Sequence, residues 1–383
     1  MRYICLVNSN KSIQYFPGLD ALRFFAALSV IITHVELLKG AFGRSNWWKE
    51  PMIFELGSLG VSFFFVLSGF LITYLLFRED YEFGKINIRK FYLRRIFRIW
   101  PLFYLVFLIG FFVLPYFDSI NIDYLQTEFE SNFWGHFLSY LFILPNLSYS
   151  IYGTPVPHIG QTWSIGVEEQ FYLVWPLLFY FFRNKIKTFV WLLVCTLLLK
   201  SIVLGLSLVV ENSIMTSLKA FLAMSKIENM IIGAIGAWIY YNNKTKFLKI
   251  IYSSPLVLMS IVSIPLLIYF GPIILQDGYH IIYSISFLII ILNVSTNNRA
   301  LLDLNHPFFN YLGKISYGIY MYHMMIIPIV IVILNRWLLE SWVYNILVYT
   351  LSIGMTIVIS ALSYEYFESK FITLKHKFAK PNR

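Results

Sequence analysis

Three ionisable residues interrupt an apolar stretch near the start of the chain, and their spacing suits acid–base chemistry. Arg23 and His34 are eleven positions apart in the stretch 16–38, which is about three helical turns and nearly the same side of a helix. Asp20 lies one turn before Arg23, where its carboxylate can pair with the guanidinium. A helix here would carry a charge pair near one end and, about 16 Å farther along, an imidazole able to act as base or nucleophile. The simpler interpretation, a structural ion pair with an unrelated packing histidine, stays open.

A second polar cluster, Gln161–Gln170, begins another apolar stretch. Glu168 and Glu169 are adjacent with no cation nearby in the sequence, and Trp163 and Ser164 lie just before them. Helix capping is the ordinary explanation, because acidic residues favour the first turn of a helix. If this stretch and 16–38 cross a membrane in opposite directions, the glutamates and His34 lie at similar depth. A carboxylate–histidine pair, in which the carboxylate orients the imidazole, is then the best acid–base candidate in the chain.

A cluster of arginines precedes the apolar stretch 99–117. Arginines near a helix end usually reach the bilayer interface or contact anionic lipid, and on sequence alone this is the simpler interpretation. The alternative is a site for a phosphorylated ligand near Arg94, Arg95 and Arg98. Arg95 and Arg98 are one turn apart, and paired guanidinium groups suit phosphate oxygens.

Two weaker candidates lie in other apolar stretches. Gly60–Phe70 offers small residues for close helix approach, with Ser68 as a candidate hydrogen-bonding group. Leu312–His323 contains Tyr320 and a second histidine, His323, for which a packing and a catalytic role are equally open. The sequence contains no P-loop, nucleophile elbow, zincin motif or Cys-rich metal site, so no metal is expected.

These side chains must be positioned by helices in a membrane. The 383 residues are 58% hydrophobic and only 13% charged, against about 25% charged in a soluble domain. The net charge of +10 could indicate nucleic-acid binding. However, Lys and Arg lie in short loops between apolar stretches rather than along one face, which excludes that class of partner.

The expected fold is all-α, a polytopic bundle in a single membrane domain over 1–383. About ten stretches are long enough to cross a hydrocarbon core of roughly 30 Å. A further stretch, 133–147, is short and ends in Leu-Pro-Asn. The ten are about 16–38, 56–77, 99–117, 168–182, 188–210, 220–241, 250–270, 280–296, 309–334 and 343–367.

The distribution of cations predicts the topology. Basic clusters follow alternate stretches, whereas no Lys or Arg occurs between Leu102 and Phe182. Placing the basic loops in the cytoplasm puts both termini in the cytoplasm. The membrane is then expected to be the cytoplasmic membrane. This works only if 133–147 does not cross fully, so we expect that segment to be re-entrant or interfacial, with its backbone satisfied by protein or water.

The motifs together resemble the acyltransferase family 3 membrane proteins, bacterial enzymes that acylate cell-surface glycans and related molecules. The resemblance spans essentially the whole chain, and its most specific element is the arginine, ten residues, histidine spacing of the first helix. The matching residues are Pro17–Arg23 with His34, Gly60–Gly69, Arg94–Pro101, Gln161–Pro176 and Leu312–His323.

The resemblance implies that Arg23 and His34 are central to activity and that Arg95 and Arg98 help to hold a cytoplasmic acyl-CoA. It also implies that the Glu168/Glu169 segment contributes to the site. Some members carry an additional extracytoplasmic hydrolase-like domain, and since the chain ends at Arg383 we expect transfer here without one, unless another protein supplies it.

The resulting hypothesis is a membrane O-acyltransferase that uses acyl-CoA, most simply acetyl-CoA, as co-substrate. His34 would act on a hydroxyl of a cell-surface or exported carbohydrate, as general base or as nucleophile, and Arg23 or backbone donors would stabilise the oxyanion.

One rival is a transporter or flippase in which the buried Arg, His and Glu form an ion pathway. A scaffold of a polysaccharide-assembly complex is a third class, but buried ionisable groups fit it poorly. The sequence does not identify the acceptor, the acyl chain or the oligomeric state.

Overall fold

The protein is a bundle of helices, as the apolar stretches predict. The computed structural model describes residues 16–274 and 279–378, and within these ranges it contains helices and no strands. Three short turns, η1 (Leu114–Tyr116), η2 (Asp118–Ile120) and η3 (Gly160–Thr162), join some of the helices, and a π-turn (Tyr364–Glu368) follows α16. The α-helices are α1 (Leu19–Ala41), α2 (Pro51–Phe83), α3 (Ile88–Phe112), α4 (Asp123–Ser131), α5 (Phe133–Leu141), α6 (Pro145–Tyr152), α7 (Trp163–Phe181), α8 (Lys185–Leu206), α9 (Ser213–Ser225), α10 (Ile227–Tyr241), α11 (Thr245–Ile251), α12 (Ser254–Ile274), α13 (Tyr279–Thr296), α14 (Pro307–Lys314), α15 (Ser316–Asn335), α16 (Ser341–Ser363) and α17 (Ser369–Phe378).

All ten expected stretches are helical, and eight helical segments in the described ranges are long and apolar enough to cross a membrane. The other two expected crossings are α7 and α13. Glu168, Glu169 and Gln170 lower the hydropathy of α7, and the apolar part of α13 is shorter. The protein is therefore a multi-pass membrane protein, and α7 packs against α2, α3 and α6.

The stretch 133–147 does not form a spanning helix. It is divided between α5 and α6, of nine and eight residues, and Ile143 between them has a left-handed backbone with φ of 57°. Helices of that length extend only about 12–14 Å, less than half of a hydrocarbon core. Whether this pair of helices is re-entrant or interfacial stays a prediction.

Two expected helices are broken where the hydrophobic pattern is continuous. The stretch 309–334 is divided between α14 and α15 at Ile315, and 220–241 is divided between α9 and α10 at Lys226. Lys226 adopts a left-handed conformation with φ of 38°, which is unfavourable for a residue with a side chain. A break within a membrane segment exposes backbone groups that neighbouring protein must satisfy.

The helix α2 is the centre of the bundle. In its apolar window 78% of the residues are buried, against 11% in α8, which therefore presents most of its surface to lipid. The small residues predicted to allow close approach do so: a Cβ on Gly60 would lie 2.6 Å from the carbonyl oxygen of Ala26, and one on Gly69 1.9 Å from that of Met230. These contacts hold α1 and α10 against α2.

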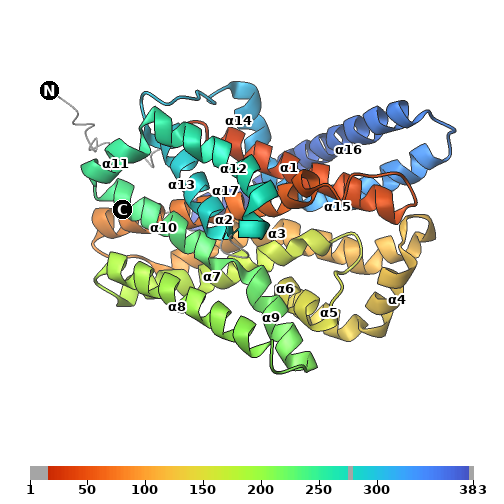
Figure 1. Ribbon diagram of the computed structural model, residues 1–383, viewed down its shortest axis with the longest axis horizontal. Coiled ribbons are helices and arrows are strands. Elements are labelled where there is room, and N and C mark those ends of the chain that lie inside the picture. Colours follow the sequence, from red (N-terminus) through yellow and green to blue (C-terminus); the bar gives the residue numbers. More distant parts are fainter. Residues whose placement is uncertain (1–15, 275–278, 379–383) are drawn as a thin grey trace.

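Elements at the two ends of the bundle differ in their content of Lys and Arg. Figure 1 shows α4 and α5 at the right-hand end, the end where α15 is joined to α16, and α11 at the opposite end. The cation-free stretch 102–182 includes α4 and α5, whereas Lys246 and Lys249 lie on α11. This separation is what the predicted topology requires. Which end faces the cytoplasm stays a prediction, and the chain termini lie outside the described residues.

Candidate functional site

The two histidines of the apolar stretches meet in the bundle. His34 on α1 is half-buried and His323 on α15 is fully buried, and Nε2 of His323 lies 3.1 Å from Nδ1 of His34. The ring centroids are 5.0 Å apart. His323 is thus the side-chain partner of the histidine in the first helix, whereas its packing or catalytic role stays a prediction.

Backbone carbonyls determine the tautomers of this pair. Nδ1 of His34 lies 3.0 Å from the carbonyl oxygen of Val30, and Nδ1 of His323 lies 2.7 Å from that of Tyr320. Because a carbonyl only accepts hydrogen bonds, both Nδ1 atoms carry the proton. The His34 Nδ1–H is then shared between the Val30 carbonyl and Nε2 of His323, and no described residue is hydrogen-bonded to Nε2 of His34. An imidazole in this tautomer can accept a proton at Nε2.

The prediction that Glu168 or Glu169 orients His34 is wrong for this structure. Glu169 accepts a hydrogen bond from the indole N–H of Trp100 at 2.9 Å, and Glu168 is hydrogen-bonded to Tyr172. Neither glutamate is hydrogen-bonded to His34 among the described residues. The reason is depth, because α7 begins at Trp163, five residues earlier than the hydrophobic pattern suggested, so the glutamates lie deeper in the bundle than its first turn.

The contacts of α15 give the order of the polar groups along its helix axis. The Tyr317 hydroxyl donates to the Ile99 carbonyl, next to Trp100, whereas Tyr320 meets α7 and His323 meets His34. Positions three apart differ by about 4.5 Å along a helix. The histidine pair therefore lies about 9 Å beyond the glutamate level.

Tyr320 and Gln161 connect the start of α7 to the histidine pair. The Tyr320 hydroxyl lies 2.8 Å from Ser164 Oγ and donates to the Gln161 carbonyl at 2.9 Å. The Gln161 amide donates to the Met321 carbonyl at 2.6 Å, two residues from His323. Trp163 instead packs edge-on against Phe65 of α2, with centroids 6.3 Å apart.

The charged part of the site is built by α2, α3 and α7. Ser68 and Tyr172 are hydrogen-bonded through their hydroxyls, and the Arg95 guanidinium lies over the Tyr172 ring, 5.8 Å from its centroid. Nε of Arg95, Oε1 of Glu169 and Oε1 of Gln161 are buried and have no hydrogen-bond partner among the described residues. Buried polar atoms without partners are rare and mark places where a ligand can bind. We name the following residues the histidine tract: His34, His323, Tyr320, Gln161, Ser164, Glu168, Glu169 and Arg95.

The three candidate donor-site arginines have different surroundings. Arg94 forms an ion pair with Glu79 at 2.5 Å, which gives it a structural partner. Arg95 belongs to the histidine tract, and Arg98 interacts electrostatically with Arg95 and with Glu368. The predicted pair of Arg23 with Asp20 is confirmed at 3.0 Å, and Arg23 also interacts electrostatically with Glu168.

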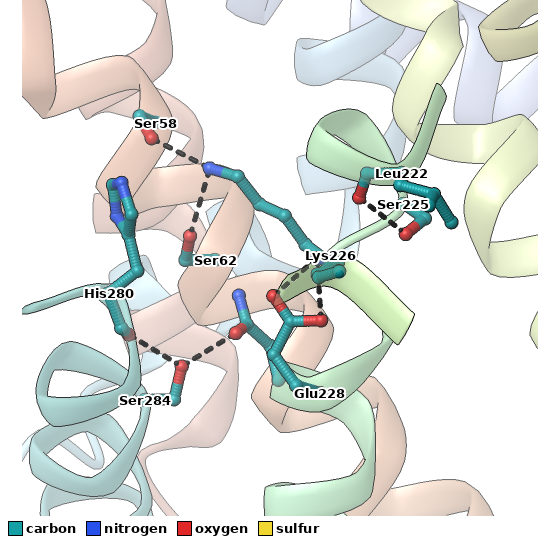
Figure 2. Close-up of polar contacts among 10 residues, drawn as sticks. Ser58, Ser62, Leu222, Ser225, Lys226, Glu228, His280 and Ser284 are labelled. Carbon is teal, nitrogen blue, oxygen red and sulfur yellow. Dashed lines mark hydrogen bonds and ion pairs between the residues drawn. The ribbon is translucent and has the colours of Figure 1, made fainter. Parts of the chain in front are cut away.

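A second buried polar cluster was not anticipated from the sequence. Figure 2 shows the Lys226 ammonium reaching Ser58 and Ser62 of α2, at 2.8 Å and 3.4 Å. Both oxygens of Glu228 accept from Lys200 of α8, each at 2.8 Å. We name these five residues the lysine cluster. Two charges in the apolar stretch 220–241 were the available signal.

No group of His, Cys, Asp and Glu in the described ranges has the arrangement of a metal site. The polar groups described above are a histidine of defined tautomer, hydroxyls, carboxylates and guanidinium groups.

Comparison with known proteins agrees with this chemistry. A family model described as an acyltransferase domain matches residues 16–365. The O-acetyltransferase OatA of Staphylococcus aureus (strain NCTC 8325) is 27% identical over 374 positions, which cover 93% of this chain and 57% of that protein. A putative O-acetyltransferase of S. aureus strain COL, SACOL0978, is 26% identical over 94% of this chain and 58% of that protein. The chain thus spans somewhat more than half the length of these curated relatives. No solved structure matches it.

Proposed function

Because the chain belongs to the membrane acyltransferase family whose model covers residues 16–365, we propose that it transfers an acetyl group from acetyl-CoA to a hydroxyl group of a carbohydrate. Curated relatives named O-acetyltransferases support oxygen as the acceptor atom and acetyl as the group transferred. The protein would act in the cytoplasmic membrane, with both termini in the cytoplasm.

The observation that carries the proposal is the histidine pair. His34 Nε2 holds a lone pair because the Nδ1–H is shared between Val30 and His323. His34 is the general base: Nε2 takes the proton of the acceptor hydroxyl as its oxygen attacks the thioester carbonyl. The C–S bond then breaks, and the proton returns from His34 to the CoA sulfur. A variant of this route has His34 attack the thioester first and carry the acetyl group.

Positive charges at one end of the tract support a site for the donor. Nε of Arg95 is buried and has no hydrogen-bond partner in the described part of the chain, and Arg98 lies within electrostatic reach of Arg95. Guanidinium groups suit the phosphates of CoA, and Arg94, although paired with Glu79, adds to the local charge. The extended pantetheine arm would then pass Glu168 and Glu169 towards His34. Arg23 or backbone N–H groups would stabilise the oxyanion.

Acetyl transfer by the purified protein tests this proposal. The full chain in detergent is incubated with acetyl-labelled acetyl-CoA and cell-wall glycan. We expect label on the glycan, and a loss of about 10²–10⁴-fold in kcat for His34→Ala, the usual contribution of a general base. His306→Asn, at an exposed helix N-cap, is the matched control and keeps full activity.

Two outcomes would contradict the proposal. Full transfer by His34→Ala would remove His34 from the chemistry. Uptake of acceptor into proteoliposomes without any acetyl transfer would support a transporter instead.

A further inference from the structure

A wide, open groove lies between α4 and the end of α6, outside the segments able to span a membrane. Its volume is about 730 Å³, within the usual range of ligand sites. We name it the α4–α6 groove. It is lined by Asp123, Tyr124, Thr127, Glu128, Tyr152, Gly153 and Thr154.

The lining suits a ligand rich in hydroxyl groups. Asp123 and Glu128 can accept hydrogen bonds, the Thr127 hydroxyl can accept because its proton is donated to the Asp123 carbonyl, and the Tyr124 ring is 65% exposed. Sugar hydroxyls can donate to the carboxylates, and a tyrosine face can pack on the apolar face of a sugar ring. No aliphatic side chain lines the groove, which disfavours an acyl chain. An anionic polymer would be repelled, because no Lys or Arg occurs between residues 102 and 182.

One wall of the groove is rigidly supported. The hydroxyl of Tyr152 lies over Gly135, where a Cβ would be 1.7 Å away, so only glycine fits there. The His136 ring packs 4.6 Å from the Tyr152 ring, centroid to centroid. His136 Nδ1 bonds Ser148 at 2.6 Å, whereas its buried Nε2 has no partner in the described part of the chain. Burial lowers the pKa of His136 to about 4, so this wall adds no positive charge at neutral pH.

The groove is at the same end of the bundle as the histidine pair. His34 is seven residues from the end of α1, about 10 Å along the helix. The side chain of Arg44, just after α1, bonds Asn335 at the end of α15. The turn η2, which leads into α4, contacts α15 as well.

A short, stiff segment connects the groove to the tract. Thr154 lines the groove, and seven residues later Gln161 bonds Met321 beside the histidine pair. Seven residues reach at most about 25 Å. Pro155 and Pro157 restrict this segment, and His158 is tied to Asn121 at 3.1 Å. The groove and the start of α7 are therefore no farther apart than this short segment allows.

We propose that the α4–α6 groove binds the acceptor, an uncharged or amine-bearing carbohydrate chain, and presents its hydroxyl-bearing end to His34. The identification of the ligand as acceptor rests on the proposed function, whereas the binding itself can be measured without transfer.

Binding and transfer are measured separately on the full chain in detergent. The probe is a hexamer of N-acetylglucosamine, and polyglycerol phosphate is the anionic comparison. Asp123→Asn combined with Glu128→Gln should weaken hexamer binding, measured by calorimetry, about tenfold or more, because neutral amides replace carboxylate acceptors. Tyr124→Ala, at an exposed ring, should weaken it as well. Glu130→Gln changes a carboxylate of the same helix that bonds Gln126 and does not line the groove, so it should bind as the wild type does.

The kinetic signature is selective. The double variant should raise KM for transfer to the hexamer by a similar factor, with kcat and the KM for acetyl-CoA unchanged. Wild-type binding without any transfer would support the groove and overturn the proposed function. Absence of hexamer binding by the wild type, equal binding by both groove variants, or tighter binding of polyglycerol phosphate would overturn the groove.

Discussion

The histidine tract and the lysine cluster are both buried, polar and placed within membrane helices, yet they differ in how their polar atoms are satisfied. In the lysine cluster both oxygens of Glu228 bond Lys200, and the Lys226 ammonium bonds two serine hydroxyls. In the histidine tract, atoms of Arg95, Glu169 and Gln161 lack partners among the described residues. Ionisable residues in a membrane are functional candidates by default. We therefore expect the histidine tract, with its unsatisfied atoms, to be the reactive site and the lysine cluster to be structural.

The lysine cluster has a structural task that explains its charges. It surrounds the break between α9 and α10, with Lys226 at the C-terminal end of one helix and Glu228 in the first turn of the next. Glu228 opposes the partial positive charge at the start of α10, and the Lys226 ammonium ties the break to α2. The cluster thereby stabilises an interruption that the membrane would otherwise disfavour.

The largest predicted difference concerns His323, which positions His34. His323→Ala should lower kcat about 10²-fold, since His34 Nδ1 loses its side-chain acceptor, and should change the acid limb of the pH–kcat profile. His323→Gln, with a carbonyl able to accept from Nδ1, should recover part of the activity. Ser58→Ala in the lysine cluster is the matched control and should leave both readouts unchanged. An unaltered pH profile in His323→Ala would reduce His323 to a packing residue.

A second prediction separates two neighbouring arginines. Arg95→Gln should raise the KM for acetyl-CoA by about tenfold or more while kcat falls little, because a phosphate-binding fork is lost. Arg94→Gln should lower thermal stability instead, since it leaves Glu79 without its ion-pair partner. If the two variants have equal KM values for acetyl-CoA, Arg95 does not bind the donor and lipid anchoring is the better explanation of Arg95.

The smallest predicted effect concerns the ion pair of the lysine cluster. Glu228→Gln should lower the free energy of unfolding by about 1 kcal/mol, between the values for surface and buried pairs, because Lys200 is 21% exposed and Glu228 9%. Activity per folded molecule should not change. Lys200→Met combined with Glu228→Leu should restore stability, measured by thermal unfolding in detergent. A loss of kcat in this double variant would mean that the lysine cluster takes part in catalysis.

Local patterns predicted much of the bundle. The apolar stretches became helices, the Asp20–Arg23 pair formed one turn apart, and the glycines of 60–69 allowed close packing. Each of these features depends on residues close together in the sequence or on the size of a side chain, and both can be read directly from the sequence. The helix breaks at Ile315 and Lys226 escaped prediction, because a continuous apolar pattern does not show where backbone hydrogen bonds are interrupted.

The sequence by itself determined the membrane location, the helices, the family and the candidate residues. The reason is that apolar length, charge placement and motif spacing are local features of the sequence. Only the tertiary structure decided which candidates meet. His34 and His323 are 289 positions apart and bond at 3.1 Å, while Glu168 and Glu169 contact Tyr172 and Trp100 rather than His34. Such pairings depend on how far each helix is displaced along its neighbours. That displacement depends on which backbone each glycine meets and on where the helices break, and neither is encoded in a local pattern.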